Sequence, residues 1–273
     1  MSKTIFITGA SRGFGKLWAE AFLKRGDKVA ATARNLSDLD DLVKTYGPNI
    51  LPIQLDVNNR ADSFAAIQKA AAYFGTIDVV INNAGFGLFG TIEETTEAEA
   101  RAQFETNVFG LLWVTQAILP VFRKQGHGHI VQVSSILGIV TLPLLGIYNA
   151  SKFAVEGISE TLQQEVSQFG IKVSMIEPNG FSTDWAGPSS NHTQHMPEYD
   201  AVRSAFNEAN AQEGVFGDPN ATSEAVLKLI DAENPPLRLF LGKHTLPWAT
   251  QVYEERLDTW KQWNEVSVAA HGA

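Results

Sequence analysis

The sequence predicts an α/β protein: one doubly wound domain in which a seven-stranded parallel sheet carries helices on both faces. The main observation is that short runs rich in β-branched and apolar residues alternate with amphipathic helical stretches along the whole chain. This alternation is typical of parallel sheets with helical crossovers. The second observation is size, because 273 residues that are 44% hydrophobic can bury a large core. The length fits one large domain or two small ones, and we favour one domain over residues 1–273.

Seven runs have the composition of strands, and their expected bounds are 4–8, 28–32, 51–55, 78–82, 129–134, 172–176 and 237–241. Between the first two runs, apolar residues at helical spacing predict a helix, and Gly26 follows its last turn as a C-terminal cap. Two long helical stretches, about 98–124 and 146–169, flank the fifth strand.

Two later segments depart from this alternation of strands and helices. The stretch 184–217 is rich in Gly, Pro, Ser, Asn and His, with a helix expected at 201–211. Long irregular insertions in compact domains are usually lids or binding loops, so we expect a substrate lid here. After the seventh strand, a C-terminal extension at about 245–266 is expected to form a closing helix that carries Trp260 and Trp263.

The composition argues against several classes of function. A formal net charge of -9 opposes binding to nucleic acid or to an anionic membrane, because both are bound mainly through clustered Lys and Arg. No segment approaches the roughly 18 unbroken apolar residues of a membrane span, and no signal peptide precedes the first strand, so a cytoplasmic protein is expected. The chain has no cysteine, and its six histidines lack metal-ligand spacing, so we expect neither disulfides nor a metal.

A glycine-rich turn lies between the first strand and the first helix. Glycines let the backbone turn tightly and approach a ligand, and the helix N-terminus offers free N–H groups and a positive dipole end to a pyrophosphate. The spacing differs from the usual G-x-G-x-x-G pattern, and an ordinary turn that caps a helix is the alternative. Its place after the first strand favours a dinucleotide site in a Rossmann-type domain, formed by Gly9, Ser11, Arg12, Gly13, Phe14 and Gly15.

The pair Tyr148 and Lys152 is the strongest indication of chemistry. Residues four apart share one face of a helix, so the Lys152 ammonium is expected to lie close to the Tyr148 phenol. A nearby positive charge lowers the pKa of a tyrosine from its ordinary value of about 10. Ser135 precedes the pair, and alternation along the strand sends Ser134 and Ser135 to opposite faces, so only one of them can face the site.

Together, these residues and Asn82-Asn83-Ala84-Gly85 resemble the classical short-chain dehydrogenases/reductases over residues 3–242. The resemblance implies an oxidoreductase in which Ser135 hydrogen-bonds the substrate oxygen, Tyr148 exchanges the proton and Lys152 binds the nicotinamide ribose. Asn107 matches the fourth residue of the family's set, which orders a water for proton relay. Taken singly, Ser135 could end a strand, Asn107 could satisfy buried backbone, and Tyr148 with Lys152 could be a helix-surface pair.

The resemblance also implies a set of cofactor contacts beyond the glycine turn. It places Asp56 and Val57 beside the adenine, although Asp56 could instead cap the helix that starts near Asn59. Asn82–Gly85 follows the fourth strand, and Pro178–Thr183 follows the sixth, where this chain has Asn179 in place of the family's usual glycine. Asn is the non-glycine residue most tolerant of positive φ, so the turn is expected to survive. The expected contacts are Asp56, Val57, Asn83, Ala84, Gly85, Tyr148, Lys152, Pro178, Phe181 and Thr183.

Charge predicts which dinucleotide is bound. NAD-preferring members of the family place an acidic residue at the end of the second strand, whereas this chain has Ala33 followed by Arg34. Arg34 and Arg12 are expected to hold a 2′-phosphate through charge-assisted hydrogen bonds. We therefore expect NADP(H), with two solvated arginines as the alternative interpretation.

Large apolar side chains are expected at the mouth of the substrate pocket, which suits a hydrophobic ketone or alcohol. They are Phe86, Leu137, Leu142, Leu145 and Trp185, with Leu88 and Phe89 nearby and His192, His195 and Met196 in the loop. About half of them could instead be core or oligomer contacts, by the usual share of apolar residues in cores. The pattern is most similar to the 17β-hydroxysteroid and retinol dehydrogenase-like members, which implies steroid-like, retinoid-like or aryl ketones.

The sequence thus predicts an NADP(H)-dependent oxidoreductase that interconverts a hydrophobic ketone or aldehyde and its alcohol. A non-catalytic NADP(H)-sensing protein on the same scaffold is the alternative, although such a protein would lose the catalytic residues that this chain keeps. An epimerase or dehydratase usually has another glycine spacing and a longer C-terminal domain. Members of the family commonly pair through their two long helices, so a homodimer or homotetramer is expected.

Overall fold

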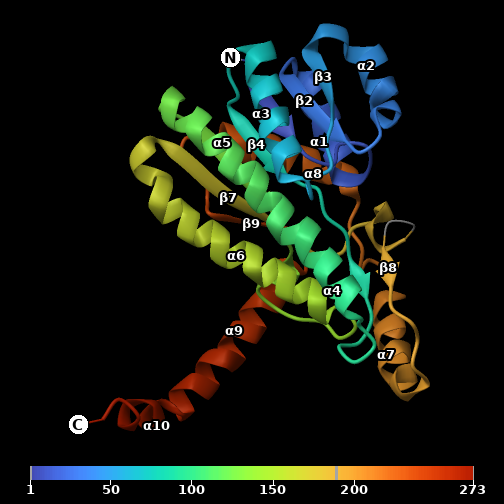
Figure 1. The fold of residues 1–273 in the computed structure, drawn as a ribbon. Coiled ribbons are helices and arrows are strands. Elements are labelled where there is room, and N and C mark those ends of the chain that lie inside the picture. The colour runs from blue at the N-terminus through green and yellow to red at the C-terminus, as the bar shows by residue number, and fades with distance from the viewer. Residues whose placement is uncertain (1, 188–189, 273) are drawn as a thin grey trace.

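The architecture is a parallel sheet between two layers of helices (Figure 1). The computed structural model describes residues 2–187 and 190–272. Seven parallel strands pair in the order β3-β2-β1-β4-β6-β7-β9, which confirms the predicted fold class. All seven predicted strands are present, with bounds within a few residues of those expected: β1 Thr4–Ile7, β2 Lys28–Ala33, β3 Ile50–Gln54, β4 Val79–Asn82, β6 Gly128–Val133, β7 Ile171–Pro178 and β9 Arg238–Leu241.

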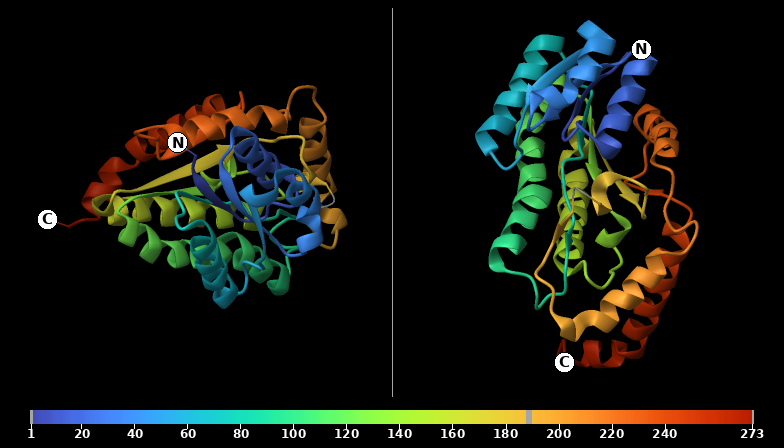
Figure 2. Two further views of the ribbon diagram at one scale, coloured as in Figure 1. Left: turned by 90° about the horizontal axis from the view of Figure 1, so that it is seen from above. Right: turned by 90° about the vertical axis from the view of Figure 1, so that its right-hand side faces the viewer.

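Helices cover both faces of this sheet (Figure 2). Apolar side chains of α1, α2 and α8 pack on one face, and those of α3, α5 and α6 pack on the other. The two predicted long stretches are present, the first as α4, a π-helical turn and α5, and the second as α6 with a short 3-10 turn. The bounds are α1 Gly13–Arg25, α2 Asp40–Tyr46, α3 Arg60–Phe74, α4 Glu97–Phe104, α5 Leu111–Gln125, α6 Gly146–Val166 and α8 Thr222–Asp231.

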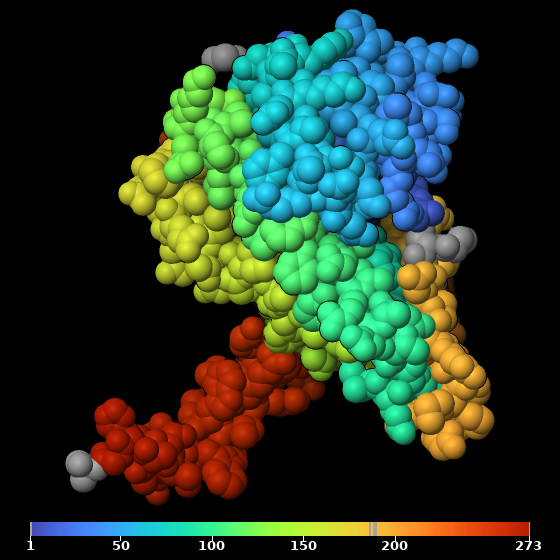
Figure 3. Space-filling model, viewed as in Figure 1, coloured from blue at the N-terminus to red at the C-terminus, as the bar shows by residue number. Residues whose placement is uncertain are grey.

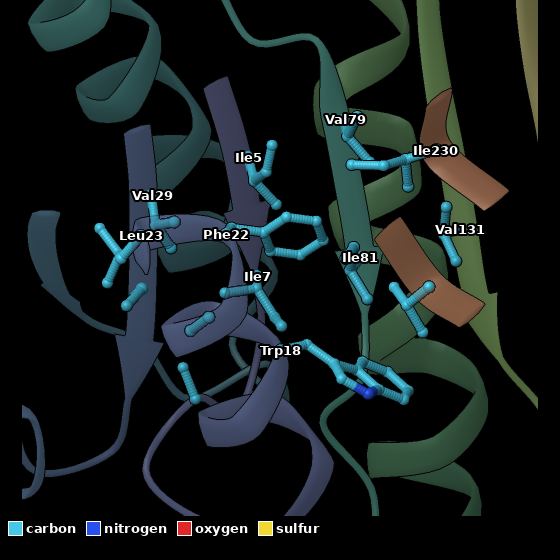
Figure 4. Close-up of a cluster of buried hydrophobic side chains, with 14 of the residues drawn as sticks. Ile5, Ile7, Trp18, Phe22, Leu23, Val29, Val79, Ile81, Val131 and Ile230 are labelled. Carbon is cyan, nitrogen blue, oxygen red and sulfur yellow. The ribbon is translucent and has the colours of Figure 1, made fainter. Parts of the chain in front are cut away.

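The core follows from alternation along the central strands. Ile5 and Ile7 of β1 point to one face, where they meet Trp18 and Phe22 of α1 (Figure 4). Phe6, between them, points to the other face and is fully buried in the second cluster. A strand buried on both faces is mostly apolar, which is why Ile5, Phe6 and Ile7 form an unbroken apolar run. Gly26 ends α1 in the left-handed conformation, as its position predicts.

Strand order determines where a ligand can bind. β1 pairs with β2 on one side and with β4 on the other, so the order of strands along the sheet reverses between β1 and β4. In such sheets a crevice opens at this switch point, beyond the carboxyl ends of the strands. The glycine turn follows β1 and the Asn82–Gly85 turn follows β4, so both lie at that crevice.

The segment expected to be a lid has structure that the sequence did not indicate. β5 (Leu88–Phe89) pairs in parallel with β8 (Asn191–His192) and forms a second, two-stranded sheet. Helix α7, Asp200–Asn210, follows at the expected place, and none of its residues is fully buried. The pairing of β5 with β8 attaches the start of this segment to the main body.

The C-terminal extension differs from the closing helix that was expected. α9 (Thr245–Gln262) and α10 (Asn264–Ala269) project away from the body as an arm (Figure 3). Only the first turns of α9 pack on the protein, and Trp260 and Trp263 are 59% and 60% exposed. The predicted C-terminal helix is present, but its far end does not pack on the domain, because the helix leaves the surface before it reaches Trp260 and Trp263. Within residues 2–187 and 190–272, no helix has the length and apolar character needed to cross a membrane.

Candidate active site

The glycine turn has the geometry of an anion site. Gly9 and Gly13 adopt positive φ values of 67° and 55°, which side chains disfavour. A Cβ at Gly15 would lie 2.2 Å from the Gly9 carbonyl oxygen, so only glycine lets α1 approach the turn. Arg12 at the N-cap is extended and makes no side-chain cap, which leaves the first N–H groups of α1 available for an anionic ligand. These features fit a dinucleotide pyrophosphate.

The side chain of Asn83 stabilises the glycine turn through hydrogen bonds. Its side-chain amide donates to the carbonyl oxygens of Thr8 at 2.9 Å and Gly9 at 3.0 Å. In return, the Thr8 hydroxyl accepts from the backbone N–H groups of Asn83 and Ala84, both at 2.9 Å. The turns after β1 and β4 are thus tied together across the crevice. The resemblance implied a cofactor contact for Asn83, and this structural role was not expected.

The adenosine end carries the predicted charges. Ala33 is buried at the end of β2, and Arg34 and Arg12 are exposed. Neither guanidinium forms an ion pair with any residue in the described ranges 2–187 and 190–272. Asp56 does not cap α3: Asn59 is the cap, since its side chain accepts from the N–H groups of Ala61 and Asp62.

Tyr148 and Lys152 lie on the buried face of α6, as their spacing predicts. They are 5% and 7% exposed, and the Lys152 Nζ lies 5.6 Å from the centre of the Tyr148 ring. The same Nζ donates a hydrogen bond of 2.8 Å to the main-chain carbonyl of Val133, at the end of β6. This contact fixes the ammonium beside the phenol.

The protonation of this pair differs from the expectation. Burial raises the pKa of Tyr148 above its ordinary value, and a hydrogen bond with Ser135 opposes that rise. Burial also lowers the pKa of Lys152 to about 8, with the Glu156 carboxylate acting in the opposite direction. The pKa of Tyr148 is therefore raised in this structure and not lowered as expected, because burial of the phenolate is the dominant effect.

The two serines after β6 face opposite ways, as alternation predicts. Ser135 hydrogen-bonds Tyr148, and its Oγ accepts from the N–H of Leu137 at 3.1 Å. Ser134 instead contacts Glu156 behind the site. Ser135 is thus the serine that reaches the phenol, and its hydroxyl lies where it can donate to a substrate oxygen.

Asn107 lies in the π-helical turn Glu105–Gly110 between α4 and α5. Its amide pairs with both main-chain groups of Phe86, accepting from the N–H at 3.1 Å and donating to the carbonyl at 3.0 Å. It also donates to the Ser151 hydroxyl at 3.3 Å. The side chain therefore satisfies buried backbone, which is the plainer of its two interpretations. π-turns inside α-helices are frequent at functional sites. The expected role of Asn107 in ordering a water for proton relay stays a prediction.

An apolar wall surrounds Tyr148. It contains four of the five predicted substrate residues, Leu137, Leu142, Leu145 and Trp185, whereas Phe86 lies outside it. Phe89, which was expected nearby, also belongs to this wall. Sequence reasoning missed Phe206 of α7, Phe240 of β9, and Trp248, Ala249 and Val252 of α9. Helical periodicity indicates that some of these side chains are buried. No local pattern predicts that side chains of α7 and α9 belong to the same cluster as Tyr148.

Besides the β5–β8 pairing, a buried carboxylate attaches the segment expected to be a lid, residues 184–217, to the rest of the protein. The Glu94 side chain has no exposed surface, and it accepts from the N–H groups of Thr91 and Met196, both at 2.8 Å, and from Arg203 of α7. These hydrogen bonds outweigh burial and lower the pKa of Glu94 to about 2. Sequence reasoning did not single out Glu94, because its partners Met196 and Arg203 are about a hundred residues away along the chain.

Three expectations for the loops are corrected or refined. Asn179 does not adopt a positive φ: within the described residues, Leu144 is the one non-glycine residue that does, at 62°. The turn therefore needs no special tolerance at Asn179.

His195 pairs with Asp200 at 2.6 Å on the surface, away from Tyr148, and the Met196 side chain is not part of the apolar wall. His192 stacks on Phe89 with ring centres 5.2 Å apart, next to that wall.

The fold and these residues define an oxidoreductase built on a dinucleotide-binding domain, and comparison with known proteins agrees. Residues 3–194 match the short chain dehydrogenase family. The chain is 39% identical over 273 residues to "Oxidoreductase BOA17" of Botryotinia fuckeliana, covering 99% of this chain and 100% of that protein. It is 36% identical over 241 residues to the 3-ketodihydrosphingosine reductase of Bacteroides thetaiotaomicron, covering 87% of each. The protein therefore belongs to the short-chain dehydrogenase/reductase family.

Solved structures extend this similarity. A short-chain dehydrogenase from Streptomyces avermitilis superposes with a TM-score of 0.91 at 36% identity, covering 98% of both chains. A serine dehydrogenase complexed with NADP+ has a TM-score of 0.75 at 28% identity, covering 89% of this chain and 95% of that one. A 3-ketoacyl-(acyl-carrier-protein) reductase from Brucella melitensis complexed with NADH has a TM-score of 0.75 at 26% identity, covering 88% and 96%. Similar chains thus bind either dinucleotide.

Proposed function

We propose that the protein is an NADP(H)-dependent reductase and dehydrogenase that interconverts a hydrophobic ketone or aldehyde and its alcohol. The observation that supports this most directly is the surroundings of Tyr148. Its phenol is buried, hydrogen-bonded to Ser135, within 5.6 Å (ring centre) of the Lys152 ammonium, and enclosed by an apolar wall. A proton donor, a second hydroxyl and a cation beside an apolar pocket are what carbonyl reduction requires.

The cofactor would be held along the crevice. The free N–H groups at the start of α1 fit a pyrophosphate, and Arg12 and Arg34 fit a 2′-phosphate. When bound, NADPH supplies a hydride to the carbonyl carbon. The remaining chemistry belongs to the protein: Ser135 donates a hydrogen bond to the substrate oxygen, and Tyr148 gives that oxygen its proton. Lys152 balances the negative charge that this transfer leaves on the phenol.

The substrate class follows from the wall. Leucine, phenylalanine and tryptophan side chains dominate it. A relative bears the name 3-ketodihydrosphingosine reductase, which denotes a ketone on a long apolar chain. We therefore propose a large apolar ketone, in line with the resemblance to 17β-hydroxysteroid and retinol dehydrogenase-like members. Residues 184–217 would act as the lid over this substrate.

A homodimer or homotetramer is also proposed. Phe109, next to α5, and Phe153 on α6 are each 39% exposed, on the two long helical stretches expected to pair. Exposed aromatic side chains of this kind are typical of interfaces. Light scattering on the purified protein measures the mass in solution, and a monomer at all concentrations would refute this assembly.

The test of function is NADPH consumption with a panel of hydrophobic ketones. Tyr148→Phe removes the proton donor and keeps the ring, so we expect activity to fall by about 10²–10⁴-fold while NADPH binding, followed by fluorescence, is kept. Activity that survives in Tyr148→Phe would remove the catalytic assignment. Tight NADPH binding by the unaltered protein, with no ketone reduced, would favour the non-catalytic sensor.

A further inference from the structure

Behind Lys152 lies a group of charged side chains that the proposed reaction does not use. Glu156 of α6 and Glu177 of β7 are 5% and 0% exposed. The Nε of Arg238, on β9, lies 3.0 Å from Glu156 and 3.5 Å from Glu177, and its Nη2 lies 2.8 Å from the exposed Glu160. We call Glu156, Glu177 and Arg238 the buried acid cluster. Burying two carboxylates against one shared guanidinium is costly unless a proton neutralises one of them.

The contacts show which carboxyl group carries that proton. Neither oxygen of Glu177 has a hydrogen-bond partner among the described residues, which suits a neutral acid better than a carboxylate. Burial and the charge of Glu156 raise the pKa of Glu177 to about 8. Burial also raises the pKa of Glu156, but Ser134, Arg238 and Lys152 all act to lower it. At neutral pH the negative charge therefore lies on Glu156, and the proton lies on Glu177.

Gly138 leaves space for the side chain of Glu156. A Cβ at Gly138 would lie 2.8 Å from the Ser134 Oγ and 2.9 Å from the Glu156 Cγ. Only glycine at this position lets the Ser134 hydroxyl and the Glu156 side chain approach each other. Ser134, the first residue after β6, therefore faces the carboxylate of Glu156, while the next residue, Ser135, faces Tyr148.

Glu156 in turn lies one helical turn after Lys152. Burial lowers the pKa of Lys152 to about 8, close to working pH, and Glu156 is the charge that raises it again. The other contacts of the ammonium are the neutral Val133 carbonyl and the Tyr148 ring. Removing Glu156 would leave a buried ammonium with no compensating negative charge.

We propose that Glu156 is a positioning residue that keeps Lys152 charged, and that Arg238 and the proton on Glu177 hold Glu156 in its ionised form. The role in catalysis rests on the proposed function, but the charge on Lys152 is measurable without it. Glu156 acts through Lys152, which lies four residues before it on α6. Charged groups that bear on Glu156 are Lys152, Glu160, Glu177 and Arg238.

The direct test is the titration of Lys152 followed by NMR in protein labelled at the lysine side chains, with Lys152→Arg used to assign the signal. In Glu156→Gln the midpoint should fall by about one pH unit, because an opposite charge at this range moves a pKa by that much or more. Glu177→Gln is the matched control, because Glu177 lies beside the same Arg238 guanidinium as Glu156. The glutamine mimics the protonated acid, so the Lys152 midpoint should stay at the value of the unaltered protein.

A milder variant covers the case in which Glu156→Gln fails to fold. Ser134→Ala removes a hydroxyl that favours the ionised form of Glu156, so the Lys152 midpoint should fall in the same direction by a smaller amount. An unchanged midpoint in the folded variants, or an equal shift in Glu177→Gln, would overturn the proposal.

The pH profile of ketone reduction tests the catalytic role separately. In Glu156→Gln the loss of kcat at high pH should begin about one unit lower, whereas Glu160→Gln should match the unaltered enzyme. A shifted Lys152 titration with no ketone reduced by the unaltered protein would leave the proposal standing and refute the proposed function. A shifted titration with an unshifted pH profile would remove the catalytic role of Glu156.

Discussion

Trp185 covers Tyr148: the two ring centres lie 4.8 Å apart, with the planes inclined at 57°. The indole comes from the start of the lid, and the phenol comes from α6. A Cβ at Gly87 would lie 2.5 Å from the indole, so Gly87 is what lets Trp185 reach this position. The lid thus contributes an aromatic surface directly over the proposed proton donor.

Replacing Trp185 should therefore alter substrate choice. Trp185→Ala opens space over Tyr148, so we expect kcat/KM for a small ketone to fall roughly tenfold, about 1.4 kcal/mol, while a bulky ketone loses less. Steady-state kinetics with the two ketones measure this. Trp260→Ala, on the exposed arm, is the control and should change neither value. An equal loss for both ketones would mean that Trp185 does not shape the pocket.

Arg34 should decide between the two dinucleotides. Arg34→Asp replaces a cation near the expected 2′-phosphate by an anion, so we expect NADPH binding to weaken by about 10²-fold relative to NADH, equivalent to one strong charge-assisted contact. Fluorescence titration with both cofactors gives the ratio. Lys124→Asp, near the C-terminal end of α5, makes the same charge change away from the crevice. If both variants alter the ratio equally, the arginine has no specific role.

Gly15 should be required for the glycine turn. In Gly15→Ala the new Cβ would lie 2.2 Å from the Gly9 oxygen and 2.5 Å from the Asn83 Nδ2, so the turn must shift. We expect a loss of stability of about 1–3 kcal/mol and weaker dinucleotide binding. Calorimetry and binding titration check both. Gly157→Ala, in α6, meets no atom within 4 Å and should keep or raise the melting temperature.

Glu94 should hold the lid. Glu94→Gln removes the charge that Arg203 and two backbone N–H groups share, so residues 190–210 should be cleaved by protease about tenfold faster. Limited proteolysis followed by mass spectrometry locates the cuts. Glu97, three residues after Glu94, gives the control: Glu97→Gln breaks an exposed ion pair with Arg101 and should not change the rate of cleavage. Unchanged cleavage in Glu94→Gln would show that the lid is held by other contacts.

His129 should make the protein sensitive to acid. Burial lowers its pKa to about 4, and Lys172 and Lys3 add to that effect. The unfolded chain takes up a proton near pH 6.5, whereas the folded protein resists it until about pH 4, so stability is full above 6.5 and falls as the pH drops. His129→Gln should flatten this dependence between pH 6.5 and 4. Melting temperatures measured across that range test it, and parallel curves for both proteins would contradict it.

Much of the fold follows from short-range patterns. Alternation and periodicity locate all seven strands of the sheet and most helices, because the faces of a strand or helix are determined by the chain itself. The spacing of Tyr148 and Lys152 alone determines that they share a face of α6. The glycine turn is likewise local, since positive φ at Gly9 and Gly13 depends on residue type.

Other properties exist only in the folded protein. The higher pKa of Tyr148 arises from burial, and no spacing shows how deeply a side chain is buried. The buried acid cluster joins α6, β7 and β9, and Glu94 joins the lid to a loop about a hundred residues earlier. The sequence by itself determined the parallel sheet, the glycine turn after β1 and the shared helix face of Tyr148 and Lys152. Tertiary structure alone decided their protonation, the apolar wall and the arm, because desolvation and long-range contacts depend on how distant segments pack.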